Sequence, residues 1–203
     1  MEIKKKLILE LNSSRFIIRK LVFDIIDIFK KNEEGDFFLP EDINDEHFYE
    51  FKKLKDGLQI ELTILPDYKI DTFLVNAEYY NEETIISIKI VYNPEKKNKI
   101  IYNLIGELNE IIAHELRHNY QYSTNMFDFK NMSKDQEESV DYYTQPHEID
   151  AQVYGFRRLS KIRKIPFESV VKDWFDTHQD IHQMNKKNVD YVIKKIIEKN
   201  NLY

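Results

Sequence analysis

The chain has no cysteine among its 203 residues, which excludes disulfide bonds and thiolate metal ligands. Any transition-metal site must therefore use His, Asp or Glu. Only four glycines and five prolines occur, which argues against a linker-rich or disordered chain. This length suits one domain with a sizeable core, so we predict a single domain over residues 1–203, with a sheet-containing part at 1–98 and a helical part at 99–203.

The sequence also lacks a dense basic block and a long apolar run. Its 30 Lys and Arg residues are interspersed with 36 Asp and Glu residues, so we expect no nucleic-acid partner. No segment reaches the ~18 apolar residues that a membrane span needs. The apolar run near the N-terminus is broken by Glu10, and no small-residue cleavage site follows it. We therefore expect a soluble, cytoplasmic protein with no membrane partner.

The periodicity of apolar residues predicts an α+β fold. Alternation of Leu7, Leu9 and Leu11 predicts an N-terminal strand, and helical spacing follows from Ser13 to about Lys31. Alternation over residues 58–65, 72–80 and 84–92 predicts three more strands, the last two forming a hairpin. A small helix is expected near His47. Helical spacing then marks residues 99–122, a helix that opens at 146, and two further helices after 166.

The segment "NEIIAHELRHNYQY", residues 109–122, carries two histidines four positions apart. On a helix, His114 and His118 face the same way and can present two imidazoles to one metal ion. Glu115 lies about 100° round the helix from His114. At this position Glu115 cannot easily be a ligand in the same tetrahedral metal site, but it can reach a water molecule bound to the metal. The helix itself is supported by an apolar stripe, formed by Ile101, Ile105, Leu108, Ile112 and Leu116.

This arrangement suits hydrolysis with Zn²⁺ as the cofactor. Zinc lowers the pKa of water towards neutrality and polarises a carbonyl group. Glu115 can accept a proton from the attacking water and return it to the leaving amine. We therefore predict a zinc-dependent amide hydrolase with Glu115 as the catalytic base. One alternative is a non-enzymatic binding or regulatory protein with the same fold, and another is a helical interaction module that carries the motif by chance.

The run His114-Glu115-Leu116-Arg117-His118 resembles the signature of the zincin metallopeptidases, H-E-x-x-H on an active-site helix. The resemblance covers the motif, its helix and the preceding strands. It implies a zincin-like α+β fold, with a small mixed or antiparallel sheet packed on this helix and further helices after it. It also implies a peptide or protein substrate bound in extended form beside an edge strand, for which residues 84–92 are the expected counterpart.

A catalytic zinc takes three protein ligands and leaves one position for water. In the metzincins, a glycine and a third histidine follow the motif, but Gln121 and Thr124 stand at those positions here. The third ligand must therefore come from elsewhere, and an acid on a later helix, as in the glutamate-zincins, is the remaining route. The segment "QPHEIDAQVYG", residues 145–155, is the obvious source.

Within this segment, Glu148 shares one helix face with Ala151, Gln152 and Gly155, whose small members let the helix approach a neighbour closely. We predict Glu148 as the third metal ligand. Asp150 and His147 are the alternatives, although both point elsewhere on the helical wheel. For Asp150, two further interpretations stay open, a carboxylate that orients a ligand histidine and a solvated helix acid.

Several other residues are weighed against simpler interpretations. Oxyanion stabilisation needs a hydrogen-bond donor, and three tyrosines flank Glu148. A second histidine pair near residue 180 has no neighbouring glutamate like Glu115, so we interpret it as a polar helix end. The single tryptophan is expected in the core, and Arg117 is expected in solvent. The three tyrosines are Tyr142, Tyr143 and Tyr154, the second histidine pair is His178 and His182, and the tryptophan is Trp174.

Overall fold

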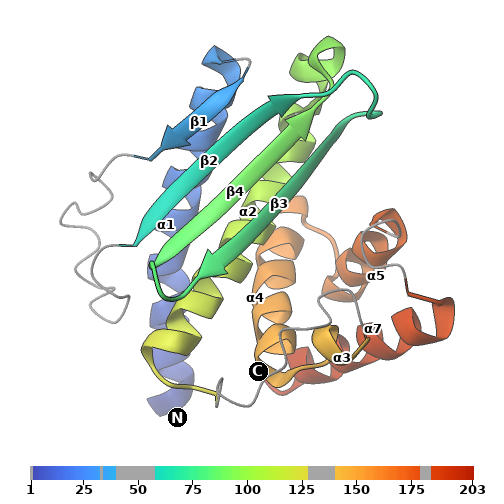
Figure 1. Cartoon of the computed structure of the whole chain (residues 1–203). Helices are drawn as coiled ribbons and strands as arrows, with labels where there is room; N and C mark the ends of the chain where they lie inside the picture. The colour runs from blue at the N-terminus through green and yellow to red at the C-terminus, as the bar shows by residue number, and fades with distance from the viewer. Residues whose placement is uncertain (1, 33, 40–57, 128–139, 179–183) are drawn as a thin grey trace.

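The computed structural model describes residues 2–32, 34–39, 58–127, 140–178 and 184–203 (Figure 1). The fold is mixed α+β, as predicted, with a four-stranded sheet. The small helix expected near His47, and His182 of the second histidine pair, lie outside the described residues. The elements in chain order are α1 (Glu2–Lys31), β1 (Gly35–Phe38), β2 (Gln59–Pro66), β3 (Phe73–Tyr80), β4 (Ile85–Tyr92), η3 (Pro94–Lys96), α2 (Lys97–Ser123), α3 (Val140–Tyr143), α4 (Pro146–Arg163), α5 (Phe167–Thr177) and α7 (Lys186–Asn201).

The strand predicted at the N-terminus is wrong, because one continuous helix, α1, runs from Glu2 to Lys31. Leu7, Ile8 and Leu11 also have the i, i+1, i+4 spacing of a helix, and no glycine or proline precedes Gly35. The second half of α1 was predicted correctly. Its apolar residues are buried, namely Ile17, Ile18, Leu21, Ile25 and Phe29.

The sheet has the strand order β1-β2-β4-β3. β2 and β4 are parallel, whereas β1 pairs with β2, and β3 with β4, in antiparallel orientation. The three strands predicted within residues 58–92 are confirmed, and the short β1 was not predicted. The expectation that residues 84–92 form the edge strand is wrong, because β4 lies between β2 and β3. The edge on the side of α4 is β3 (Figure 1).

The helices α1 and α2 cover one face of the sheet (Figure 1). Ile86, Ile88 and Ile90 of β4 are fully buried in the cluster that also holds Leu108 and Ile112 of α2. Burial of each such side chain stabilises the fold by about 1.5–3 kcal/mol. The α2 helix is therefore fixed firmly against the sheet, with the remaining part of its surface free to carry polar side chains.

A second hydrophobic cluster joins α3, α4, α5 and α7, with Phe156, Phe175 and Ile196 among its buried members. α4 also packs along α2, so it connects the two clusters. This places the start of α4 beside the histidine motif on α2. Within the ranges that the structure describes, none of the helices has the length and apolar character needed to cross a membrane.

Candidate metal centre

The two histidines of the motif lie on α2, as predicted, and face the same way. The Nε2 atoms of His114 and His118 are 3.0 Å apart, and their ring centroids are 4.7 Å apart. His118 is 7% exposed, so this pair lies at the edge of the protein interior rather than in solvent. The helix spacing alone therefore brings together two nitrogens that could bind a metal ion.

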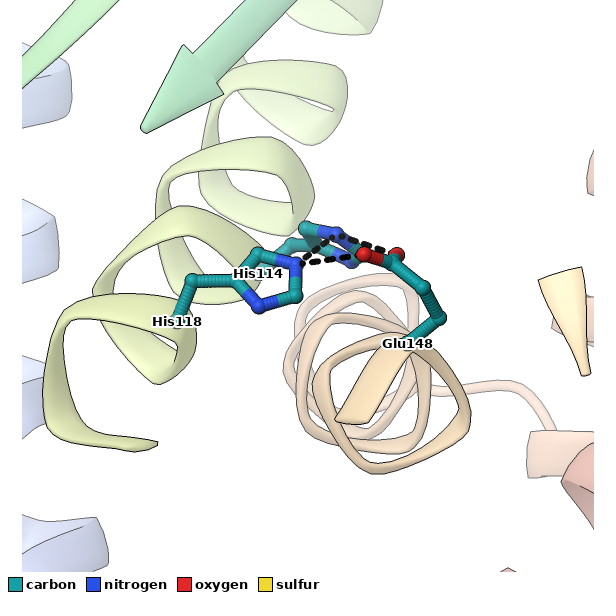
Figure 2. Close-up of side chains that lie close together, drawn as sticks. All are labelled: His114, His118 and Glu148. Atoms are coloured by element: carbon teal, nitrogen blue, oxygen red, sulfur yellow. Dashed lines mark hydrogen bonds and ion pairs between the residues drawn. The ribbon is translucent and has the colours of Figure 1, made fainter. Parts of the chain in front are cut away.

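The third member of the cluster comes from α4, and it is Glu148. This residue lies in the first turn of α4, where a negative charge also interacts favourably with the helix dipole. Its Oε2 lies 3.5 Å from His114 Nε2, and its Oε1 lies 3.3 Å from His118 Nε2. Figure 2 shows the two imidazoles and the carboxylate pointing toward one another across the gap between α2 and α4.

The spacing of these three groups fits a single metal ion. Ligand atoms about 2.0–2.2 Å from a tetrahedral zinc lie roughly 3.3–3.6 Å from one another. The observed separations among His114, His118 and Glu148 are 3.0, 3.3 and 3.5 Å. Within the described part of the chain, these three residues form the group of His, Asp or Glu side chains able to hold a metal ion.

The charges in the cluster also favour a cation at its centre. Burial opposes ionisation of Glu148, but His118 and hydrogen bonds from the neighbouring histidines hold the pKa of its carboxyl well below the ordinary value. Burial likewise opposes protonation of His118, yet the charge of Glu148 and its hydrogen bond raise the pKa of His118 to about 9. The carboxylate is thus ionised in a buried place, where it needs a positive charge beside it.

A hydrogen-bonded chain orients His118 from behind. Its Nδ1 lies 2.9 Å from Gln121 Oε1, which can only accept, so Nδ1 donates to Gln121 and Nε2 is the nitrogen that faces His114 and Glu148. Gln121 Nε2 donates to Asp150 Oδ2 at 2.8 Å and to the carbonyl oxygen of His147 at 2.9 Å. Asp150 is therefore linked to His118, a candidate ligand, through Gln121 and not by direct contact.

Arg117 completes this chain, and the expectation that it is solvated is wrong. The side chain is 7% exposed, and its Nε donates to Asp150 Oδ2 at 2.6 Å. The hydroxyl of Tyr203 also donates to Asp150. Asp150 is thus engaged away from the metal-binding group. His147, the other alternative ligand, contacts Glu148 itself, with its Nε2 3.2 Å from Glu148 Oε1.

Replacing Gln121 by Met is expected to weaken zinc binding by about 10–100-fold, because the tautomer and orientation of His118 are no longer fixed. Competition with a chromophoric zinc chelator measures this change. The matched control is Gln59→Met at an exposed position of β2, which should leave the affinity unchanged. Equal zinc affinity in both variants would contradict a supporting role for Gln121.

The close approach of α2 and α4 depends on the small residues predicted on the Glu148 face. Ala151 is fully buried. A Cβ atom added at Gly155 would lie 2.7 Å from Glu110 Oε1 and 3.0 Å from the Glu110 carbonyl oxygen. The backbone of α2 therefore passes directly against Gly155. This contact sets how far Glu148 can reach toward the histidines.

We expect Gly155→Ala to destabilise the protein by about 1–3 kcal/mol, because the added methyl group pushes against the α2 backbone. Urea unfolding measures the effect. Gly106→Ala is the matched control, since a Cβ there meets Arg163 Nη2 at an ordinary 3.5 Å. That variant should be stabilised by about 0.5–1 kcal/mol through helix propensity. Similar stability of the two variants would show that the helices are not in tight contact at Gly155.

Glu115 lies beside the metal-binding group without joining it. Its Oε1 is 4.0 Å from His114 Nε2, and the residue is 6% exposed. Burial raises the pKa of its carboxyl, His114 and His118 lower it, and Glu148 raises it again. A carboxyl whose pKa lies above its ordinary value is a better proton acceptor near neutral pH.

A cavity of about 250 Å³ opens on this side of the cluster and reaches His114, Glu115 and Glu148. Two of the three candidate tyrosines, Tyr142 and Tyr143, line it as well. Tyr142 also hydrogen-bonds with Glu148, and its pKa is raised by burial and then by Glu148, so its hydroxyl keeps its proton.

The third candidate tyrosine and the lone tryptophan are placed differently. Tyr154 instead packs against the guanidinium of Arg117, 5.6 Å from its ring centroid, and is not among the residues that line the cavity. Trp174 was expected in the core and is half-buried, where it lines the cavity together with His178. Their rings stack at 4.4 Å with an interplanar angle of 14°.

Comparison of the chain with protein-family models, curated proteins and solved structures gives no significant match. The geometry of the site therefore carries the functional argument. Sequence reasoning did not identify the supporting roles of Gln121 and Arg117. Gln121 follows His118 by three residues on the same helix, and this spacing was the one signal in the sequence for their contact.

Proposed function

We propose that the chain is a zinc-dependent metallopeptidase of the zincin type, with His114, His118 and Glu148 as the metal ligands. The observation that carries this proposal is the meeting of Glu148 with the histidine pair. The two sides of the site are 30 or more residues apart in sequence and lie on different helices. Two histidines and a carboxylate are a ligand set of catalytic zinc sites, which keep one further position open.

The residues around the site support hydrolysis. A bound zinc ion supplies Lewis-acid polarisation of a carbonyl and a lowered pKa for water. Glu115, whose carboxyl faces the same cavity, accepts a proton from the attacking water and delivers it to the leaving amine. Tyr142 keeps a protonated hydroxyl beside Glu148 in the cavity, and this O–H would stabilise the negative charge that develops on the carbonyl oxygen once it turns from Glu148 to the substrate.

The surroundings of the cavity support a peptide as the substrate. β3 is an edge strand, and Val75, Asn76 and Ala77 in its middle line the cavity. Edge strands offer unpaired backbone groups that can pair with an extended chain. In the zincins that the motif resembles, an edge strand binds the extended peptide, and we assign that role to β3 in place of residues 84–92.

Metal analysis combined with a peptide assay tests the proposal. The purified protein is expected to hold one zinc ion per chain and to cleave members of a mixed peptide library. Dialysis against a chelator should abolish cleavage, and added zinc should restore it. Protein without bound zinc would contradict the proposal. Zinc-bound protein that cleaves no peptide would instead favour the non-enzymatic binding or regulatory function.

A further inference from the structure

The cavity continues beyond the candidate metal centre, along α2 toward its N-terminal end. Glu107, Glu110, Ile111 and His114 all line it, and their spacing places them on one face of the helix. Glu110 precedes His114 by about one helical turn, a rise of roughly 6 Å. The cavity therefore has a second end, separate from the metal-binding group and rich in carboxylates.

Two polar groups at this second end lack the partners that burial demands. Glu110 is 6% exposed, and no described residue makes a hydrogen bond or an ion pair with its carboxyl group. Gln152 is 5% exposed, and its Oε1 has no hydrogen-bond donor among the described residues. Both are acceptors on the wall of one cavity, and buried acceptors without donors cost free energy.

The charges at this end are also unbalanced. Glu107 is paired with Arg163 Nη2 at 3.0 Å and lies 3.8 Å from His178 Nε2. Burial, then Glu107 and Glu115, raise the pKa of the Glu110 carboxyl well above the ordinary value, and the more distant charge of Arg163 offsets this only in part. Among the described residues that line the cavity there is no Lys or Arg. The described lining thus offers two acceptors without a hydrogen-bond donor, and no Lys or Arg beside them.

We propose that this end of the cavity is a subsite for a cationic substrate side chain, Lys or Arg, whose charged group binds between Glu110 and Gln152. The inference rests on the proposed peptidase function, since it assigns a side-chain preference to that same substrate. Lys carries its ammonium on a four-carbon stem, which suits a site about one helical turn from the reacting group. Phe156 and Trp174 line the cavity and offer apolar surface to such a stem.

Binding of a matched pair of probes tests this subsite without turnover. Nα-acetyl-lysine amide and the uncharged Nα-acetyl-norleucine amide are titrated against the Glu115→Gln variant and followed by NMR. We expect the Lys probe to bind at least about tenfold more tightly than the norleucine probe, because it alone satisfies the two acceptors. Equal affinity, or no binding of the Lys probe at millimolar concentrations, would overturn the subsite.

A further substitution shows which residue is responsible. Adding Glu110→Gln should remove the preference for the Lys probe. The amide has nearly the same shape as the carboxyl group and carries no charge, so the substitution should leave the fold intact. Glu83→Gln, in the exposed turn after β3, makes the same formal change and should keep the preference. If the preference survived Glu110→Gln in a folded protein, the assignment would be overturned.

A cleavage assay separates this inference from the proposed function. Peptides that differ only by Lys or norleucine at each position are incubated with the zinc-loaded protein. Cleavage of both peptides at equal rates at every position would support the peptidase and contradict the subsite. A binding preference for the Lys probe without cleavage of any peptide would leave the subsite standing and contradict the peptidase.

Discussion

Replacing Glu115 by Gln is expected to lower kcat/KM for peptide cleavage by about 10²–10⁴-fold, while zinc remains bound. The amide has nearly the same shape as the carboxylate but cannot accept the proton. Since Glu115 lies 4.0 Å from His114 Nε2 and is outside the metal-binding group, its replacement removes no ligand. Zinc content and cleavage rate, measured on the same preparation, test both halves of this expectation.

The comparison needs a control for general disturbance of the helix. Glu107→Gln and Glu110→Gln are unsuitable, because both residues line the cavity. Glu95→Gln, in η3 ahead of α2, changes the same charge away from the cavity and should keep full activity. Cleavage by Glu115→Gln at the rate of the unmodified protein would refute the catalytic base. Loss of zinc in that variant would show that Glu115 is a ligand instead.

Glu148→Gln is expected to weaken zinc binding by more than about 100-fold, which exceeds the effect of a group that only supports a ligand. The substitution removes the carboxylate that faces both histidines at 3.3 and 3.5 Å. Asp150→Asn should cost only about 10–100-fold, because Asp150 acts through Gln121. Both affinities can be obtained by chelator competition.

The order of these two effects distinguishes the alternatives left open by the sequence. Glu168→Gln, at an exposed position in the first turn of α5, provides the control for the loss of one charge. If Asp150→Asn weakened zinc binding more than Glu148→Gln did, the assignment of the third ligand would have to move to Asp150.

The helix that bears the motif and the face of α4 that bears Glu148 were predictable, because both rest on local spacing. The i, i+4 rule places His114 and His118 side by side without reference to the rest of the chain. The small residues Ala151 and Gly155 indicated a close contact with another helix. The close approach of Glu110 on α2 to Gly155 confirms that contact. The site could therefore be outlined from two short segments.

Features that depend on distant partners were not predictable from such spacing. The parallel pairing of β2 with β4 places β3 at the edge, and nothing within either strand reveals that order. Arg117 looked solvated because its partner Asp150 is 33 residues away on another helix. The strand predicted for the N-terminal segment was wrong for a different reason, since the leucines there satisfy both helical and strand spacing.

Anomalous diffraction at the zinc edge, from crystals grown with one equivalent of zinc, tests the central claim most directly. The account predicts one peak per chain between α2 and α4, about 2.0–2.2 Å from the Nε2 atoms of His114 and His118 and from a carboxylate oxygen of Glu148. A peak bound by Asp150 or His147 in place of Glu148, or no peak near the two histidines, would contradict it.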